Sequence, residues 1–167
     1  GVIGLFIAAY SFIMMFIQFI GGSPIIYLSS KHSYSQLLIP SYIWALLMGA
    51  AAYGVLFFFP VLDAQYNIHI CCMAVLHSLW MLNSFVLIGK ERVKAHNAIQ
   101  LCYIFILILV FISIYLAAYK DAYAYIYALY FANTVILLLS SILIIPDWKR
   151  SLLNVGSSFN ETLKKIL

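Results

Sequence analysis

Apolar residues fill the chain in long runs, and polar residues gather in short segments between them. Five apolar runs cover residues 5–29, 37–59, 68–88, 98–119 and 122–145. A helix needs about 20 such residues to cross the hydrocarbon core of a bilayer. Hydrocarbon offers the backbone no hydrogen-bond partner, so runs of this length are expected to be helices. The pattern predicts an all-α membrane protein, a five-helix transmembrane bundle.

The connections between the runs are short, and the chain divides into two parts. Residues 1–146 are predicted to form the transmembrane bundle, and residues 147–167 form a more polar tail. Ser158 or Asn160 is expected to cap a helix in this tail. One face of that helix carries four apolar residues at helical spacing: Phe159, Leu163, Ile166 and Leu167. We interpret the tail as an amphipathic cytoplasmic segment, either an interfacial helix or the lead into a further span.

Composition supports a bilayer as the surroundings of the chain. Hydrophobic residues make up 66% of it and charged residues only 8%, whereas soluble domains carry roughly 25% charged residues. Apolar sequence begins directly after Gly1, without the basic segment that precedes a signal peptide. We therefore expect no signal peptide and interpret the chain as part of a longer protein.

The basic residues fall almost entirely on one side of the predicted bundle. If the five runs alternate in direction, one side receives eight Lys and Arg residues: Lys31, Lys90, Arg92, Lys94, Lys149, Arg150, Lys164 and Lys165. The other side receives only Lys120. Because Lys and Arg in short loops mark the cytoplasmic side, the sequence predicts a multi-pass membrane protein with its basic side in the cytoplasm. Its N-terminus would lie outside and its C-terminus in the cytoplasm.

The first apolar run contains two adjacent glycines and a proline. As one straight helix, residues 2–30 would extend about 43 Å across a core of roughly 30 Å. Pro24 has no N–H to donate and clashes with the preceding turn, and Gly21 and Gly22 lie close to it. We expect a kink or a break here. The small residues would either let a neighbouring helix approach closely or act as a hinge.

Two interior residues are candidates for a functional role. His77 is the one titratable residue near the middle of a run apart from cysteines and tyrosines, and Asn83 follows it on the same run. An ionisable group inside a membrane is a functional candidate, but His77 beside Ser78 is also typical of a hydrogen-bonded interior residue. Six polar residues are expected to face a shared interior: Gln18, Ser41, Asn83, Gln100, Asn133 and Thr134.

The patterns that support catalysis are missing from the sequence. It contains no paired carboxylates, nucleophile elbow, phosphate-binding loop or zinc motif. Cys71, Cys72 and Cys102 lack metal-ligand spacing and are expected to behave as small apolar residues. No two histidines lie at matched depth to hold a haem. We therefore predict that the protein is not an enzyme and uses no metal or cofactor.

Three segments resemble bacterial polysaccharide exporters. GVIGLFIAAYSFIMMFIQFIGGSPIIYLSS is similar to the second transmembrane helix of the O-antigen and lipid-linked oligosaccharide flippases. These belong to the multidrug/oligosaccharidyl-lipid/polysaccharide exporter superfamily. LNSFVLIGKERVKAHNAIQ looks like their link between the fourth and fifth helices, and SSFNETLKKIL looks like the lead into the seventh. On this alignment the chain covers helices two to six, part of the N-terminal lobe of a two-lobe flippase of twelve or more helices.

The resemblance implies transport without covalent chemistry. Such proteins turn a polyprenyl-diphosphate-linked oligosaccharide over from the cytoplasmic face to the outer face, for surface polysaccharide assembly. The implied partners are membrane lipid, the lipid-linked glycan and other polysaccharide-assembly proteins, with no nucleic acid. Many relatives place a cation inside the first lobe, and no run here has one. The candidates for meeting the diphosphate are then Lys31, Lys90, Arg92 and Lys94 at the cytoplasmic mouth.

Three other functions stay open. The chain would also suit a multidrug-type exporter of the same superfamily, although such a protein favours an acidic residue in its cavity. It would suit an accessory membrane subunit with five spans. A membrane enzyme of lipid or glycan metabolism would need a polar cluster that the sequence does not reveal.

Overall fold

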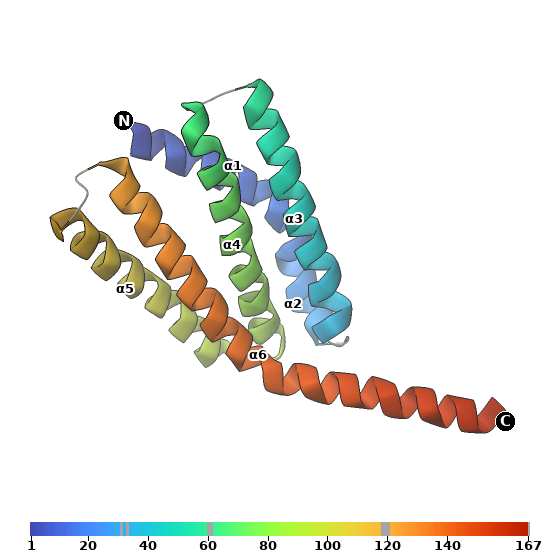
Figure 1. The fold of residues 1–167 in the computed structure, drawn as a ribbon. Helices are drawn as coiled ribbons and strands as arrows, with labels where there is room; N and C mark the ends of the chain where they lie inside the picture. Colours follow the sequence, from blue (N-terminus) through green and yellow to red (C-terminus); the bar gives the residue numbers. More distant parts are fainter. Residues whose placement is uncertain (31, 33, 60–61, 118–120, 167) are drawn as a thin grey trace.

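The computed structural model describes residues 1–30, 32, 34–59, 62–117 and 121–166 (Figure 1). These residues form helices and no strand. The helices are α1 (Val2–Gly21), α2 (Ser23–Ser29), α3 (Tyr34–Phe58), α4 (Ala64–Gly89), α5 (Val93–Ala117) and α6 (Ala122–Ile166). Counting α1 and α2 as one crossing, five spans in this part of the chain are long and apolar enough to cross a membrane. The predicted all-α five-helix bundle is confirmed.

Helix α4 lies at the centre of the bundle. It contacts α1, α2, α3, α5 and α6, and Figure 1 shows it between the α2–α3 side and the α5–α6 side. In its most apolar 18-residue stretch, 61% of α4 is buried, compared with 6% of α5. Helix α5 therefore leaves most of its apolar surface uncovered by the other described helices.

The helices α4 and α5 begin earlier than the apolar runs that predicted them. Helix α4 starts at Ala64 instead of residue 68, and α5 starts at Val93 instead of residue 98. Apolar composition marks where hydrocarbon begins, whereas a helix continues beyond that depth until a turn ends it. The polar first turns of both helices therefore lie outside the apolar runs.

The first span is interrupted, as the sequence predicted. Helix α1 ends at Gly21, α2 begins at Ser23, and Gly22 between them has a ψ of −118°. Pro24 lies in the first turn of α2, where its missing N–H costs no hydrogen bond. The Gly22 N–H still donates to the Gln18 carbonyl at 2.9 Å, and the Gly22 carbonyl accepts from Ile25 at 3.1 Å. Both backbone groups of Gly22 thus stay hydrogen-bonded at the break.

A tight turn joins α4 to α5. The Glu91 N–H donates to the Ile88 carbonyl and the Arg92 N–H to the Leu87 carbonyl, both at 2.8 Å. This pair of bonds is the Schellman arrangement that ends many helices. Glu91 takes the left-handed position of the motif, with φ of 61°. The turn brings the basic residues of this connection to the end of the central helix.

Helix α6 continues well beyond the bundle. It runs through Pro146 to Ile166, and Figure 1 shows it bending, with its C-terminal part projecting away from the other helices. A proline inside a helix removes one hydrogen bond and bends the helix, but it need not end it. The expectation of a tail helix that starts at Ser158 or Asn160 is therefore wrong. The side chains of residues 147–166 lie outside those described, so the predicted amphipathic face stays a prediction.

Substitution of Gly89 tests the close approach of α2 to α4. A Cβ at Gly89 would collide with Ser29 Oγ and the Ile26 carbonyl oxygen, and the carbonyl belongs to backbone that cannot rotate away. We expect Gly89→Ala to lower the free energy of unfolding in detergent by about 1–3 kcal/mol. Gly54→Ala is the matched control, because a Cβ there meets nothing within 4 Å. Equal unfolding midpoints for the two variants would contradict this packing.

Candidate functional site

The polar side chains of the central helix form the candidate site. Five of them bond to other helices, and we call this set the α4 polar row: Asn67, His69, Ser78, Asn83 and Ser84. Asn67 Nδ2 donates to the Leu56 carbonyl of α3 at 3.1 Å. His69 Nδ1 lies 3.1 Å from Tyr130 Oη of α6. Ser84 Oγ lies 2.6 Å from His96 Nδ1 of α5. The polar row thus attaches α4 to several of its neighbours.

Asn83 joins three helices. Its Nδ2 donates to Ser140 Oγ at 3.0 Å and to Ser141 Oγ at 3.3 Å, both on α6. Its Oδ1 accepts a hydrogen bond from Tyr42 Oη on α3. Asn83 is 1% exposed and Ser140 is fully buried, so the amide is satisfied inside the protein. We interpret Asn83 as a structural node.

His77 lies within an aromatic enclosure, which we define as Tyr10, Trp80 and Tyr103. Their ring centroids lie 5.7, 4.7 and 5.4 Å from that of the imidazole, respectively. Trp80 lies one turn away from His77 on α4, whereas Tyr10 belongs to α1 and Tyr103 to α5. Trp80 Nε1 donates to Asn133 Oδ1 on α6 at 2.8 Å. Helices α1, α4 and α5 therefore meet at this histidine, and α6 reaches the enclosure through Asn133.

Two buried polar atoms of this enclosure have no hydrogen-bond partner among the described residues. They are His77 Nδ1 and Tyr10 Oη. Ser78, which the sequence placed beside His77, instead has its single O–H donor within reach of the Ala74 carbonyl at 2.5 Å and of Met14 Sδ on α1 at 3.2 Å. A buried polar atom without a partner costs about 1–3 kcal/mol. Such atoms call for an explanation through water, a ligand or a functional role.

The other polar residues expected in the interior differ in how far they are buried. Ser41 and Asn133 are buried, while Gln18 and Gln100 are only partly buried. Thr134 is exposed, so its predicted interior position is wrong. A threonine hydroxyl can bond to a carbonyl of its own helix, so an exposed threonine needs no partner from another helix.

The basic candidates lie at one end of α4. Arg92 Nη1 donates to the Leu143 carbonyl of α6 at 3.0 Å, so this guanidinium ties the turn to α6. Lys94 is exposed at the beginning of α5, and Lys90 is partly buried at the end of α4. Lys31 lies outside the described residues. The structure brings Lys90, Arg92 and Lys94 to one end of the bundle, but it keeps them apart from His77, which lies within α4.

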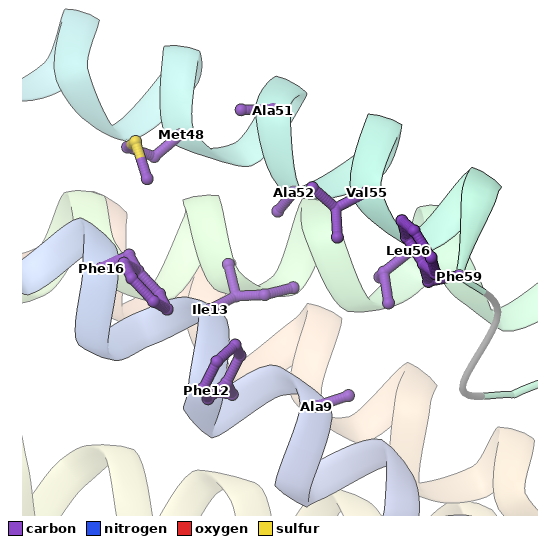
Figure 2. A pocket seen from close by; sticks show the side chains of 10 residues that line it. All are labelled: Ala9, Phe12, Ile13, Phe16, Met48, Ala51, Ala52, Val55, Leu56 and Phe59. Atoms are coloured by element: carbon purple, nitrogen blue, oxygen red, sulfur yellow. The ribbon is translucent and has the colours of Figure 1, made fainter.

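An apolar groove lies between α1 and α3 and has a volume of about 490 Å³. Figure 2 shows side chains of both helices around it, with Phe12, Ile13 and Phe16 from α1 opposite Met48 and Leu56 from α3. Every lining residue is apolar. The groove therefore suits only an apolar occupant such as a lipid chain.

The described residues contain no group of three or more His, Cys, Asp or Glu side chains that could hold a metal ion. Cys71 is buried, Cys72 is partly buried and Cys102 is exposed on α5, and all three are free thiols. These positions agree with the interpretation of the cysteines as small apolar residues.

Sequence reasoning missed the aromatic enclosure and the partners of Asn83. Trp80 follows His77 by three positions, so its place on the same helical face was readable from spacing. Tyr10, Tyr42 and Tyr103 were not readable, because contacts between separate spans depend on how each helix is rotated in the bundle.

The fold and the α4 polar row define the class: this is a multi-pass, all-α membrane protein. Comparisons of the chain with protein-family models, with curated proteins and with solved structures gave no match.

The Asn83 node predicts a measurable coupling between helices. Asn83→Ala leaves Tyr42 Oη and Ser140 Oγ without this partner, so we expect a loss of about 1–2 kcal/mol in the free energy of unfolding. In a double-mutant cycle with Tyr42→Phe, the coupling energy should be about 0.6 kcal/mol or more.

Ser113→Ala is the matched control for this cycle. Ser113 is exposed on α5 and donates only within its own helix, to the Leu109 carbonyl at 2.7 Å. Its removal should leave stability unchanged. A zero coupling energy between Tyr42 and Asn83 would show that the bundle does not depend on this node.

Proposed function

We propose that the chain forms part of a flippase for polyprenyl-diphosphate-linked oligosaccharides. It would supply the second to sixth helices, within the N-terminal lobe of a two-lobe exporter of twelve or more helices. The protein would move its substrate by changes of conformation and would carry out no covalent chemistry. The sugar and diphosphate would cross in a wet cavity between the lobes while the prenyl chain stays in lipid.

The observation that carries this proposal is the interrupted first span. The segment that resembles the second helix of the exporters is the one that breaks between Gly21 and Ser23. Discontinuous helices are a recurrent device of transporters, and a break of this kind provides a pivot. Gly21, Gly22 and Pro24 are the hinge residues in this proposal.

The α4 polar row gives further support. A lobe that moves as a unit must stay intact while it moves, and hydrogen bonds between nitrogen and oxygen atoms tie α4 to α3, α5 and α6. These four helices suit the rigid part of one half of a rocking transporter. A multidrug exporter would use the same scaffold, and the transport assay below separates the two functions.

The basic end of α4 would face the cytoplasm, at the mouth of the cavity. Lys90 and Lys94, with Lys31, would meet the diphosphate there, since the described spans hold no other Lys or Arg than Lys94 at the start of α5. Arg92 would also meet the diphosphate, because a guanidinium has five N–H donors and one of them, on Nη1, donates to the Leu143 carbonyl and positions the turn. The membrane would be the inner (cytoplasmic) membrane, with the N-terminus outside and the C-terminus inside.

Cysteine labelling tests this orientation. In a background without Cys71, Cys72 and Cys102, Lys94→Cys should react with an impermeant maleimide only after the cells are permeabilised. Asp63→Cys is the matched position, because Asp63 is exposed just before the opposite end of α4, and it should react in intact cells. Labelling in the reverse order would overturn the orientation and the proposed direction of transport.

A transport assay tests the function itself. The protein in proteoliposomes should move a fluorescent lipid-diphosphate oligosaccharide between leaflets, measured by its protection from an added glycosidase. Lys94→Glu should slow the initial rate severalfold by repelling the diphosphate, whereas Lys94→Arg should keep the rate. Export of a cationic dye without movement of the glycolipid would instead favour the multidrug exporter.

A further inference from the structure

We propose that His77 is a proton-binding site, and that protonation of its imidazole ties α1 to α4. The site consists of His77 and the aromatic enclosure of Tyr10, Trp80 and Tyr103. The link to movement rests on the proposed transport function, whereas proton binding itself does not. The ligand is a single proton taken from water.

The first argument is the isolation of His77 from other charges. The described spans contain no Asp, Glu, Lys or Arg except Lys94. The titratable groups around the imidazole are phenols: Tyr10 from α1 and Tyr103 from α5, with Tyr125 of α6 beside both. The Asn133 amide of α6 also lies beside His77. Among these neighbours, imidazole is the group whose ordinary titration range lies near neutral pH.

The second argument is the aromatic surroundings. Aromatic faces attract a cation whose centre lies within about 6 Å of the ring centroid. The three rings of the enclosure lie 4.7–5.7 Å from the imidazole centroid. No carboxylate lies among these neighbours, so the three rings are the groups that would have to stabilise an imidazolium against the cost of burying its charge. Protonation adds one hydrogen to the ring nitrogen that carries the lone pair, and no other bond is made or broken.

The third argument is the pair of polar atoms without partners. In an imidazolium both ring nitrogens donate, so Nδ1 requires an acceptor. Tyr10 Oη is buried, lacks a partner among the described residues, and belongs to a ring whose plane lies at 83° to that of the imidazole. Movement of Tyr10 onto Nδ1 would satisfy both atoms with one hydrogen bond between α4 and α1.

The break at Gly22 provides the means for this movement. Tyr10 precedes Gly22 by twelve residues, or about 18 Å of helix. At that distance, a pivot of a few degrees displaces the phenol by about 1 Å. Proton binding at His77 would therefore draw the N-terminal half of the first span toward α4, and proton release would free it.

Trp80 provides the readout, because a protonated imidazole in contact with an indole quenches its fluorescence. A variant with Trp44→Phe and Trp148→Phe keeps Trp80 as its sole tryptophan. The pH of this variant in nanodiscs is then titrated while its fluorescence is measured. We expect reversible quenching on acidification that disappears in His77→Gln. A pH-independent Trp80 signal, or one retained in His77→Gln, would overturn the proposal.

Tyr10→Phe keeps the ring but removes the proposed acceptor, so the midpoint pH of the Trp80 quenching should fall by about one pH unit. Tyr125→Phe is the control and should leave the midpoint in place. If His77→Gln does not fold, Tyr10→Phe still tests the proposal. An unchanged midpoint of the Trp80 titration in Tyr10→Phe would overturn the link to α1. Neither measurement uses a glycan, so failure of the flippase assay leaves the proton site standing, and the reverse also holds.

Discussion

A polar side chain inside hydrocarbon has no water to bond to, and this constraint organises the bundle. Asn67, Ser78, Asn83 and Ser84 all lie on one helix, α4, and all are buried. Helix α4 can keep them only if other helices surround it and supply partners. The same requirement for partners therefore accounts for both the central position of α4 and its hydrogen bonds to four other helices. The membrane drives every span to be helical, but the polar row decides which span lies in the middle.

The same constraint explains why an apolar helix can lie at the edge of the bundle. Helix α5 is apolar on almost every side, and it meets the core through a few residues such as Ile99 and Tyr103. It needs no partner for most of its length because lipid is an adequate solvent for its side chains. Such a helix is held by its short turn to α4, by the Ser84–His96 contact and by packing against α6.

The sequence was sufficient for the spans, the break and the position of the basic turn, since each rests on a local signal. Length and apolarity define a span, Pro24 predicts an interruption, and a basic segment marks a connection. Which face of each helix lies in the interior of the bundle was harder to predict from the sequence. In runs that are apolar on all sides, no stripe identifies the interior face, and Thr134 was misplaced for that reason. His77 and Asn83 stood out as polar exceptions, but their partners Tyr10, Tyr103 and Tyr42 depend on the relative rotation of separate helices.

The hydrogen bonds of the α4 polar row are unevenly distributed among its neighbours. Helices α3, α5 and α6 are joined to α4 by bonds between nitrogen and oxygen atoms. The described hydrogen bond between α1 and α4 is Ser78 Oγ to Met14 Sδ, and a thioether is a weak acceptor. Helix α1 also contributes Tyr10 Oη, one of the two polar atoms of the enclosure without a partner. The span most weakly bonded to the centre is thus also the interrupted one. If one element of the bundle moves against a fixed core, the distribution of hydrogen bonds selects α1, with Gly22 as its pivot.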